Sequence, residues 1–288
     1  MSRFLLLSAA SAVSLSLGLT ANAQDATSRQ DAIIVTTPGP DREADELIGN
    51  ATALDREDIL ENLASTLGDT LDREPGVATT FFGQGASRPI LRGLGAERVQ
   101  VLTNGLGVID VSAASPDHQV TADGIDAEKI EILRGPAALA YGGQAIGGVV
   151  NVIDGLIVEE LPEEAYSADL FGAYNSVNEG TELAAKGQFV TGPFVLSLSA
   201  SQRDFGDFDI PGFAESPFQI AAEEAEEEDH DHDDDHDHDN EEEEAFGTLE
   251  NSFLETQTLA AGLSWVGNDA FFGVAIRQQT AEYGLPGH

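Results

Sequence analysis

The segment IEILRGPAALAYGGQAIGGVVNVI, residues 130–153, contains the strongest fold signal in the chain. Residues 130–134 predict a strand that ends at Gly135-Pro136, and residues 148–153 predict a second strand after a glycine-rich turn. The apolar run 137–153 is not expected to be a membrane-spanning helix, because each interior glycine destabilises a helix by about 1 kcal/mol relative to alanine. The segment therefore indicates strands joined by tight turns.

The residues before this segment complete a compact α/β unit that we expect to begin near residue 41. Apolar residues spaced for one helix face follow Asp55 and Asp58 and continue to Leu71, and Pro75-Gly76 ends this predicted helix. Residues 98–103 predict a further strand, which enters the tight turn Asn104-Gly105.

The first 23 residues have the organisation of a secretory signal peptide. Arg3 supplies a positive start, residues 4–19 an apolar stretch, and Ala21-Asn22-Ala23 a small-x-small cleavage site. A first transmembrane helix is the alternative, but serines interrupt the apolar run and no charged stop-transfer cluster follows it. We therefore expect an exported protein.

Residues 24–40 are expected to be a flexible N-terminus that contains one β-prone run, Ile33 to Thr37, ended by Pro38-Gly39-Pro40. Such a run on a loose terminus suits β-augmentation, in which a partner adds the segment to its own sheet. It is equally typical of an ordinary first strand of the following domain.

The pattern changes near residue 165 to strict alternation of apolar with small or polar residues. Five segments of about 9 to 11 residues follow, the length of a tilted membrane strand. A soluble sandwich gives similar alternation, but here short turns after residues 191 and 266 contrast with a long link between about Asp204 and Glu255. Outer-membrane barrels have short periplasmic turns and long extracellular loops.

The composition favours a cation as ligand. The chain has no cysteine and a formal net charge of −39, with 16 acidic residues between Glu223 and Glu244. Nucleic acid is excluded as a partner because phosphate binding needs a basic face, and any metal must be held by His, Asp or Glu.

The acidic tract contains two His-x-His pairs alternating with aspartates within residues 229–239. Side chains at i and i+2 of an extended chain project to the same side, so each pair can place two imidazoles near one Zn²⁺. A solvated acidic tract is the alternative. The candidate metal ligands in this tract are His230, His232, His236, His238, Asp231 and Asp237.

Two long motifs carry a resemblance to a known family. Residues 88–105, RPILRGLGAERVQVLTNG, and residues 130–153 resemble the two plug signatures of TonB-dependent receptors. The resemblance implies an α+β plug domain over residues 41–160, followed over 161–288 by the first antiparallel strands of a transmembrane β-barrel, with an extracellular loop at 206–255. The signature positions are Arg92, Gly93, Arg134, Gly135, Pro136, Tyr141, Gly142, Gly147 and Gly148.

The resemblance also implies a location and partners. The protein is expected in the outer membrane of a Gram-negative cell, in contact with its lipid, with the plug and N-terminus periplasmic. Residues Ile33, Ile34, Val35, Thr36 and Thr37 become a TonB box, contacted by TonB and its inner-membrane energising complex. Arg92 and Arg134 are placed to pair with barrel carboxylates.

A narrower likeness points to zinc. Residues 110–118, DVSAASPDH, together with the His/Asp-rich tract and residues 283–288, resemble the zinc-uptake branch of these receptors. In that branch an Asp-His pair at the plug apex helps to bind zinc, a role that carries over to Asp117 and His118. Without the resemblance, a Pro-Asp-His sequence is more typical of a turn with a solvated histidine.

We therefore expect a receptor that binds extracellular Zn²⁺ as its transported ligand, with no catalytic cofactor and no enzymatic activity. The alternatives are copper, nickel, haem or siderophore as the ligand, or a passive surface metal-binding protein. Plugged transporters have about 22 strands, so five predicted strands indicate an amino-terminal portion or a non-functional truncated product.

Overall fold

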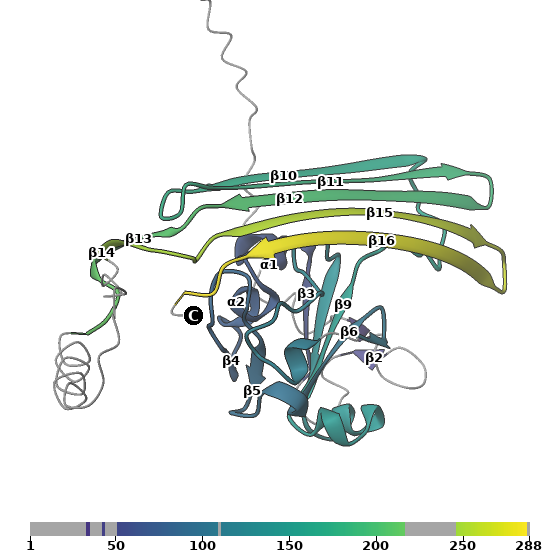
Figure 1. The fold of residues 1–288 in the computed structure, drawn as a ribbon. Coiled ribbons are helices and arrows are strands. Elements are labelled where there is room, and N and C mark those ends of the chain that lie inside the picture. The colour runs from purple at the N-terminus through teal and green to yellow at the C-terminus, as the bar shows by residue number, and fades with distance from the viewer. Residues whose placement is uncertain (1–32, 35–41, 44–50, 109–110, 217–245, 287–288) are drawn as a thin grey trace, which may run out of the picture.

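The computed structural model describes residues 33–34, 42–43, 51–108, 111–216 and 246–286. The predicted signal peptide and the acidic tract lie outside these residues. The chain has two main parts, a small α/β plug and a long, curved antiparallel sheet, here called the wall, which lies over one side of the plug (Figure 1).

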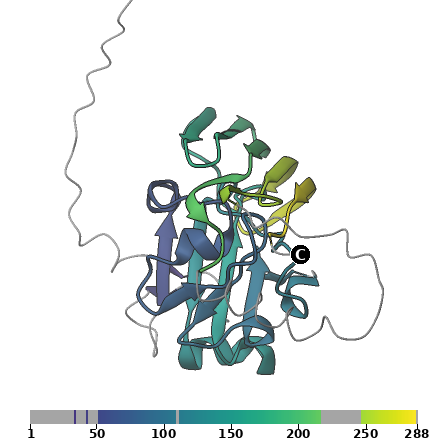
Figure 2. The ribbon, with the colours of Figure 1, turned by 60° about the vertical axis from the view of Figure 1, so that its left-hand side comes forward.

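A five-stranded sheet forms the centre of the plug, as the second view shows (Figure 2). Strands β6 and β9 are parallel and the other neighbours are antiparallel. The order across the sheet is β3 (Ala51–Asp55), β8 (Lys129–Leu133), β9 (Gly148–Ile153), β6 (Val99–Thr103) and β7 (Leu106–Gly107).

The central strands of the plug are buried on both faces. Ile130, Ile132 and Val150 are fully buried in the main apolar core, which also contains residues from the helical segment. The three strands predicted from sequence at 98–103, 130–134 and 148–153 are confirmed to within one residue at each end.

The single predicted helix is wrong in one respect, because two short helices, α1 (Arg56–Glu61) and α2 (Leu67–Leu71), take its place. Asp55 caps α1 as expected, accepting hydrogen bonds from the amides of Glu57 and Asp58. The chain then restarts at Thr66, whose hydroxyl accepts from the amide of Asp69 at 3.2 Å. This capping residue competes with a continuous helix, because its side chain satisfies a free amide of the new first turn.

Shorter elements complete the plug. They are β1 (Ile33–Ile34) paired with β2 (Arg42–Glu43), β4 (Val77–Thr79) paired with β5 (Pro89–Leu91), and the 3-10 helices η2 (Ala96–Arg98), η3 (Val111–Ala113), η4 (Gly135–Tyr141) and η5 (Gly143–Ala145).

The wall is a meander of long antiparallel strands in the order β10-β11-β12-β15-β16. Their bounds are Tyr166–Asn175, Gly180–Thr191, Phe194–Phe205, Leu254–Val266 and Phe271–Tyr283. The five predicted segments are confirmed as neighbouring strands. The short turns 192–193 and 267–270 lie at one end, and the long β12–β15 connection lies at the other end together with the connection 176–179.

The two faces of the wall differ in polarity. Large apolar side chains lie on the face away from the plug, where Leu170 is 82% and Ile276 73% exposed. The opposite face carries small hydroxyl side chains such as Ser197, Thr258 and Ser264, which are buried against the plug. This is the division between lipid-facing and lumen-facing positions that a barrel strand requires.

Sequence analysis missed a hairpin within the long connection. Strands β13 (Phe208–Phe213) and β14 (Phe246–Leu249) pair with an irregular register and flank residues 217–245 in the sequence. The rings of Phe213 and Phe246 meet edge to face at 4.9 Å between centroids. This aromatic pair stabilises the pairing of the two strands, which the polar residues around them would not predict.

No helix among the described residues is both long and apolar enough to cross a membrane.

Candidate functional site

The predicted Asp-His pair lies in a short loop after η3. The Asp117 carboxylate accepts a hydrogen bond from the Ser115 hydroxyl, and its Oδ1 lies 3.2 Å from His118 Nδ1. The His118 side chain is 47% exposed. The hydrogen bonds from Ser115 and His118 lower the pKa of Asp117, so the carboxylate stays ionised beside the ring.

Backbone contacts fix this loop to the end of the wall. The His118 amide donates to the Ser115 carbonyl at 3.1 Å, which closes a turn. The next amide, of Gln119, donates to the phenolic oxygen of Tyr283 at the end of β16, also at 3.1 Å. The pair therefore lies where the plug meets the strand ends opposite the short turns, the plug apex.

The other predicted metal ligands cannot be placed beside this pair. His230, His232, His236, His238, Asp231 and Asp237 lie outside the described residues. Within the described ranges, no group of three or more His, Asp or Glu side chains is arranged to hold a metal ion. Asp117 and His118 thus form at most part of a site.

The predicted TonB box is described only at its start. Ile33 pairs with Glu43 and Ile34 with Arg42 in a two-residue antiparallel ladder. Val35, Thr36 and Thr37 lie outside the described residues. The described half of this segment pairs with its own chain through very few residues.

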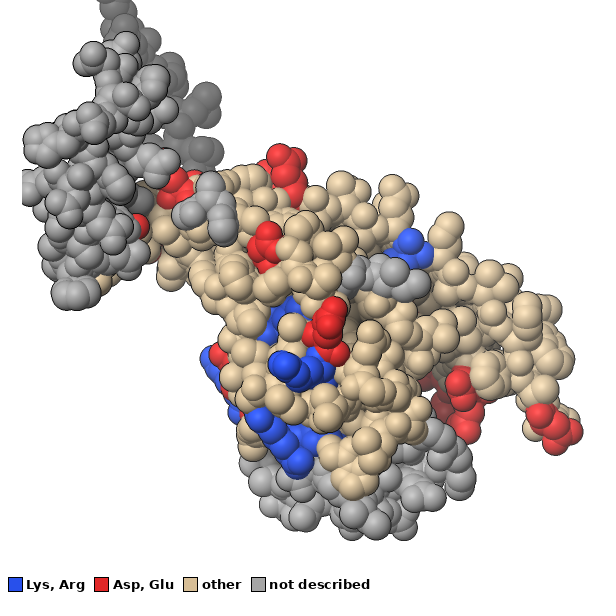
Figure 3. All heavy atoms as spheres, turned by 60° about the horizontal axis from the view of Figure 1, so that its bottom comes forward, with Lys and Arg blue, Asp and Glu red and all other residues tan. Residues whose placement is uncertain are grey.

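Two of the signature residues, Arg92 and Arg134, belong to the plug. Lys and Arg side chains gather on the side of the plug turned away from the wall (Figure 3). Arg134 is buried, donates from Nη1 to Thr52 Oγ1 at 3.1 Å, and has no hydrogen-bond partner for Nε and Nη2 among the described residues. Burial and the nearby charge of Arg92 lower the pKa of Arg134. The nearby carboxylate of Glu74 opposes this shift of the Arg134 pKa.

The signature glycines permit close packing and tight turns. Gly148 has a φ of +146° and lies where a Cβ would overlap the side chain of Leu91, and a Cβ at Gly147 would come within 2.8 Å of the Arg98 carbonyl. Gly93, Gly135 and Gly142 have positive φ at turns. Pro136 stands in the first turn of η4, and Tyr141 ends that helix, packed against a second small core.

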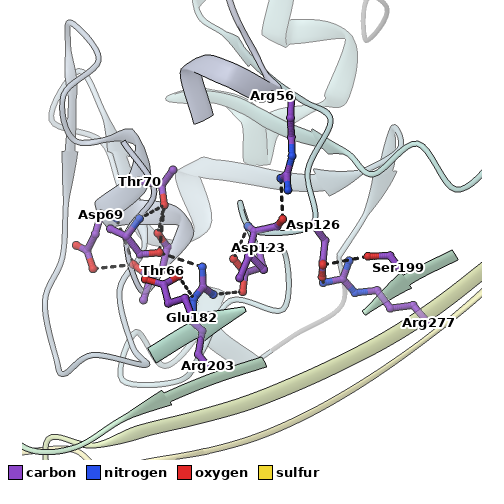
Figure 4. Close-up of polar contacts among 12 residues, drawn as sticks. Arg56, Thr66, Asp69, Thr70, Asp123, Asp126, Glu182, Ser199, Arg203 and Arg277 are labelled. Atoms are coloured by element: carbon purple, nitrogen blue, oxygen red, sulfur yellow. Dashed lines mark hydrogen bonds and ion pairs between the residues drawn. The ribbon is translucent and has the colours of Figure 1, made fainter. Parts of the chain in front are cut away.

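The plug is fixed to the wall by a buried ion-pair cluster that sequence analysis did not single out. Arg203 of β12 is 1% exposed, and it pairs with Asp123 of the plug and with Glu182 of β11, whose Oε2 lies 2.9 Å from Arg203 Nε. A third bond runs from Arg203 Nη2 to the carbonyl of Ala64 at 3.1 Å. Figure 4 shows these groups converging between the plug and the inner face of the wall.

Neighbouring residues of the same plug segment, Asp123–Glu128, are held by other strands. Asp126 lies 3.0 Å from Arg277 of β16 and accepts a hydrogen bond from Ser199 of β12 (Figure 4). Burial raises the pKa of Asp126, and Arg277 opposes that shift. Lys186 of β11 donates to Glu128 Oε1 and to the carbonyls of Asp126 and Asp154.

Arg56 completes the attachment from the plug side. Its Nη1 donates to the carbonyls of Ile125 and Ala127 at 2.7 and 2.9 Å, and its Nη2 reaches Asp169 of β10 at 3.3 Å. The segment therefore contacts or is bridged to four strands. Arg203 could have been noticed in the sequence, because it is an arginine at a lumen-facing position of an alternating strand. Its partner Asp123 could not, because it is 80 residues away in the sequence.

The fold and these contacts define a plug packed against the polar face of an antiparallel wall. The model of the TonB-dependent Receptor Plug Domain family matches residues 43–149. The fold is therefore a plug domain followed by antiparallel strands like those of a TonB-dependent barrel. The predicted fold class and outer-membrane location are confirmed, with the plug on the periplasmic side.

Individual relatives differ in their named ligands. The vitamin B12 transporter BtuB of Vibrio vulnificus (strain CMCP6) is 27% identical over 182 residues, which are 62% of this chain and 29% of that protein. The iron-regulated outer membrane virulence protein of Vibrio cholerae is 30% identical over 156 residues, covering 49% and 23%. The copper transporter OprC has a similar fold, with a TM-score of 0.60 at 16% identity over 83% of this chain and 31% of that one.

The chain spans less than a third of the length of each of these proteins. The relatives are transporters and outer-membrane proteins, which supports a role other than catalysis.

Proposed function

We propose that the receptor containing this chain binds extracellular Zn²⁺ at the plug apex and imports it into the periplasm by coupling to TonB. The observation that carries the proposal is the geometry of His118. When Nδ1 donates to Asp117, the opposite ring nitrogen, Nε2, is left as an acceptor on a half-exposed ring. This carboxylate–histidine arrangement orients imidazole ligands in many zinc sites.

The geometry refines the role of Asp117. Its Oδ1 is engaged by both Ser115 and His118, so the carboxylate is better suited to orient the ring than to act as the principal ligand. Zinc is usually four-coordinate, and His118 supplies one nitrogen. We assign the remaining ligands to the tract containing His230, His232, His236 and His238, which would collect ions and deliver them to the apex.

Coupling is assigned to residues 33–37. The β1–β2 ladder has only two residue pairs, so little pairing within the chain has to be exchanged when a partner adds this segment to its own sheet. TonB and its energising complex are the proposed partner, and pulling on this segment would rearrange the plug.

Import is distinguished from passive binding by an uptake assay. Cells producing the full receptor would be given radioactive Zn²⁺, and accumulation would be compared for wild type, a deletion of residues 31–37, a deletion of residues 223–244, and His118→Ala. The proposal predicts that deletion of 31–37 abolishes accumulation while zinc binding to the cell surface persists. Accumulation that is indifferent to that deletion would leave only passive metal binding.

A chelate is the second candidate ligand, because the relative with 27% identity is named a vitamin B12 transporter. A chelate such as cobalamin brings its own metal ligands and needs apolar and hydrogen-bonding contacts rather than a free imidazole. Competition separates the two: excess cobalamin or ferric siderophore should leave zinc uptake unchanged if zinc is the ligand, and should itself be taken up if a chelate is.

A further inference from the structure

The loop at residues 80–86 of the plug contains a buried amide that the proposed metal site does not use. Gln84 is 1% exposed. Its Nε2 donates to the carbonyls of Gly206 at 2.7 Å and Ser252 at 2.6 Å, and its Oε1 accepts from the side chain of Asn178. One plug side chain thus joins the β10–β11, β12–β13 and β14–β15 connections, all at the end of the wall opposite the turns 192–193 and 267–270.

Two of these connections form the base of the β13–β14 hairpin. Gly206 lies between β12 and β13, and Ser252 lies between β14 and β15. Ser252 is fully buried, and its hydroxyl accepts a hydrogen bond from the amide of Phe208 at 2.9 Å. The Ser252 amide donates to the carboxylate of Asp207 at 2.7 Å. Any displacement of Gln84 therefore disturbs both strands of the hairpin at their origin.

A second contact joins the same loop to the hairpin. The ring of Phe81 lies against that of Phe208, with 6.4 Å between centroids. The loop is closed by its own backbone bonds, from Phe82 to Ala86 and from Ala86 to Gly83. A closed loop moves as a unit, so the polar and aromatic contacts act together.

Tyr283 links this loop to the neighbouring loop of the apex. A Cβ on Gly85 would come within 2.6 Å of the Tyr283 ring, so only glycine permits this approach. The hydroxyl of the same tyrosine accepts the Gln119 amide beside His118. The two apex loops and the hairpin base are thus connected through packed groups.

We propose that Gln84 is a positioning residue that couples the β13–β14 hairpin to the plug apex, so that the hairpin is held while the plug is seated and released when the 80–86 loop moves. The donor geometry is specific, because a glutamine amide gives two hydrogens to two carbonyls while its oxygen takes a third bond. The inference does not depend on which ligand the receptor imports.

Hydrogen exchange on the full chain in detergent micelles tests this coupling. The variants are Gln84→Met, which keeps the shape but no polar atoms, and Gln84→Glu, which keeps the acceptor but loses both donors. Removing such buried bonds should speed exchange at the amides of Phe208, Asp209 and Ser252 on the order of tenfold. Amides of β8 and β9 should keep their wild-type protection, which shows that the plug is folded.

Gln188→Ala is the matched control, because Gln188 also donates from the wall to a plug carbonyl, but through one 3.4 Å bond at Gly155. It should leave the hairpin amides unchanged. Unchanged hairpin exchange in both Gln84 variants would overturn the proposal. Equal acceleration throughout the plug and hairpin would also overturn it, since Gln84 would then contribute only to overall stability.

Discussion

The plug meets the wall in two regions that are built differently. Around Arg203 the contacts are buried, charged and made by several strands to one plug segment. Around His118 the side chains are half-exposed, and a hydrogen bond from the Gln119 amide to the Tyr283 hydroxyl joins the loop to the wall. The first region fixes the position of the plug, and the second leaves the His118 ring half-exposed, which suits the proposed binding and release of a cation.

The largest effect is expected from breaking the buried cluster. Arg203→Ala would leave Asp123 and Glu182 buried without their cation, which typically costs about 3–5 kcal/mol. Urea unfolding of the protein in micelles would measure the loss. Arg73→Ala is the control, because Arg73 is exposed and its hydrogen bond to Asn62 is on the surface. Equal losses for the two variants would show that Arg203 does not anchor the plug.

A smaller loss is expected where wall and plug backbones touch. A Cβ at Gly262 of β15 would overlap the Leu156 carbonyl, so Gly262→Ala should destabilise the protein by about 1–3 kcal/mol through overpacking. Gly172→Ala is the matched variant, since a Cβ there would lie 3.4 Å from Leu183 and make ordinary contact. If Gly262→Ala unfolds at the wild-type urea concentration, the plug does not pack against β15 as described.

The apex should respond in affinity rather than in stability. Asp117→Asn keeps the size of the side chain but removes the charge that orients His118, and loss of such a partner typically weakens metal binding about 10–100-fold. Zinc titration and urea unfolding of the same preparation would measure both quantities. A change in unfolding without a change in zinc affinity would assign Asp117 to the fold instead of the site.

The smallest effect concerns a partly buried carboxyl away from both regions. Burial raises the pKa of Asp69, and hydrogen bonds such as that from Thr66 only partly oppose it. Because the folded pKa lies above the unfolded value of 3.8, stability from this group is greatest below that pH and declines as pH rises through the raised pKa.

Asp69→Asn should therefore be most destabilising, relative to wild type, at the acidic end and least at neutral pH. Thermal unfolding between about pH 3.5 and 7 gives the comparison, with the exposed Asp269→Asn as control. A pH-independent difference between Asp69→Asn and wild type would contradict the raised pKa.

The strands of the plug and wall could be predicted from the sequence, whereas the contacts between plug and wall could not. Local patterns were sufficient for β9, which runs from Gly148 to Ile153 as predicted, and for the Asn104-Gly105 turn, where both residues have positive φ. They were sufficient for the wall as well, because lipid and plug impose opposite polarities on alternate residues. The prediction of one helix up to Leu71 was wrong because Thr66 caps a new helix there, and the spacing of apolar residues does not indicate such a cap.

Long-range contacts were beyond those patterns. The residues around Arg203 in the sequence do not indicate that Asp123 is its partner, and Gln84 contacts Ser252 across 168 positions. The Asp117–His118 pair was predicted only from the resemblance. The contacts of Ser115 with Asp117 and of Tyr283 with the Gln119 amide depend on the folded loop lying beside β16, which local sequence patterns do not predict.

Calorimetry tests the central claim most directly. Zn²⁺ would be titrated into the full protein, into His118→Ala, and into the protein lacking residues 223–244, with Cu²⁺ and Ni²⁺ in parallel. The account predicts zinc binding that survives deletion of the tract and weakens at least about tenfold in His118→Ala, the scale of losing one oriented ligand. Binding that disappears with the tract and is unchanged by His118→Ala would contradict a specific site at the plug apex.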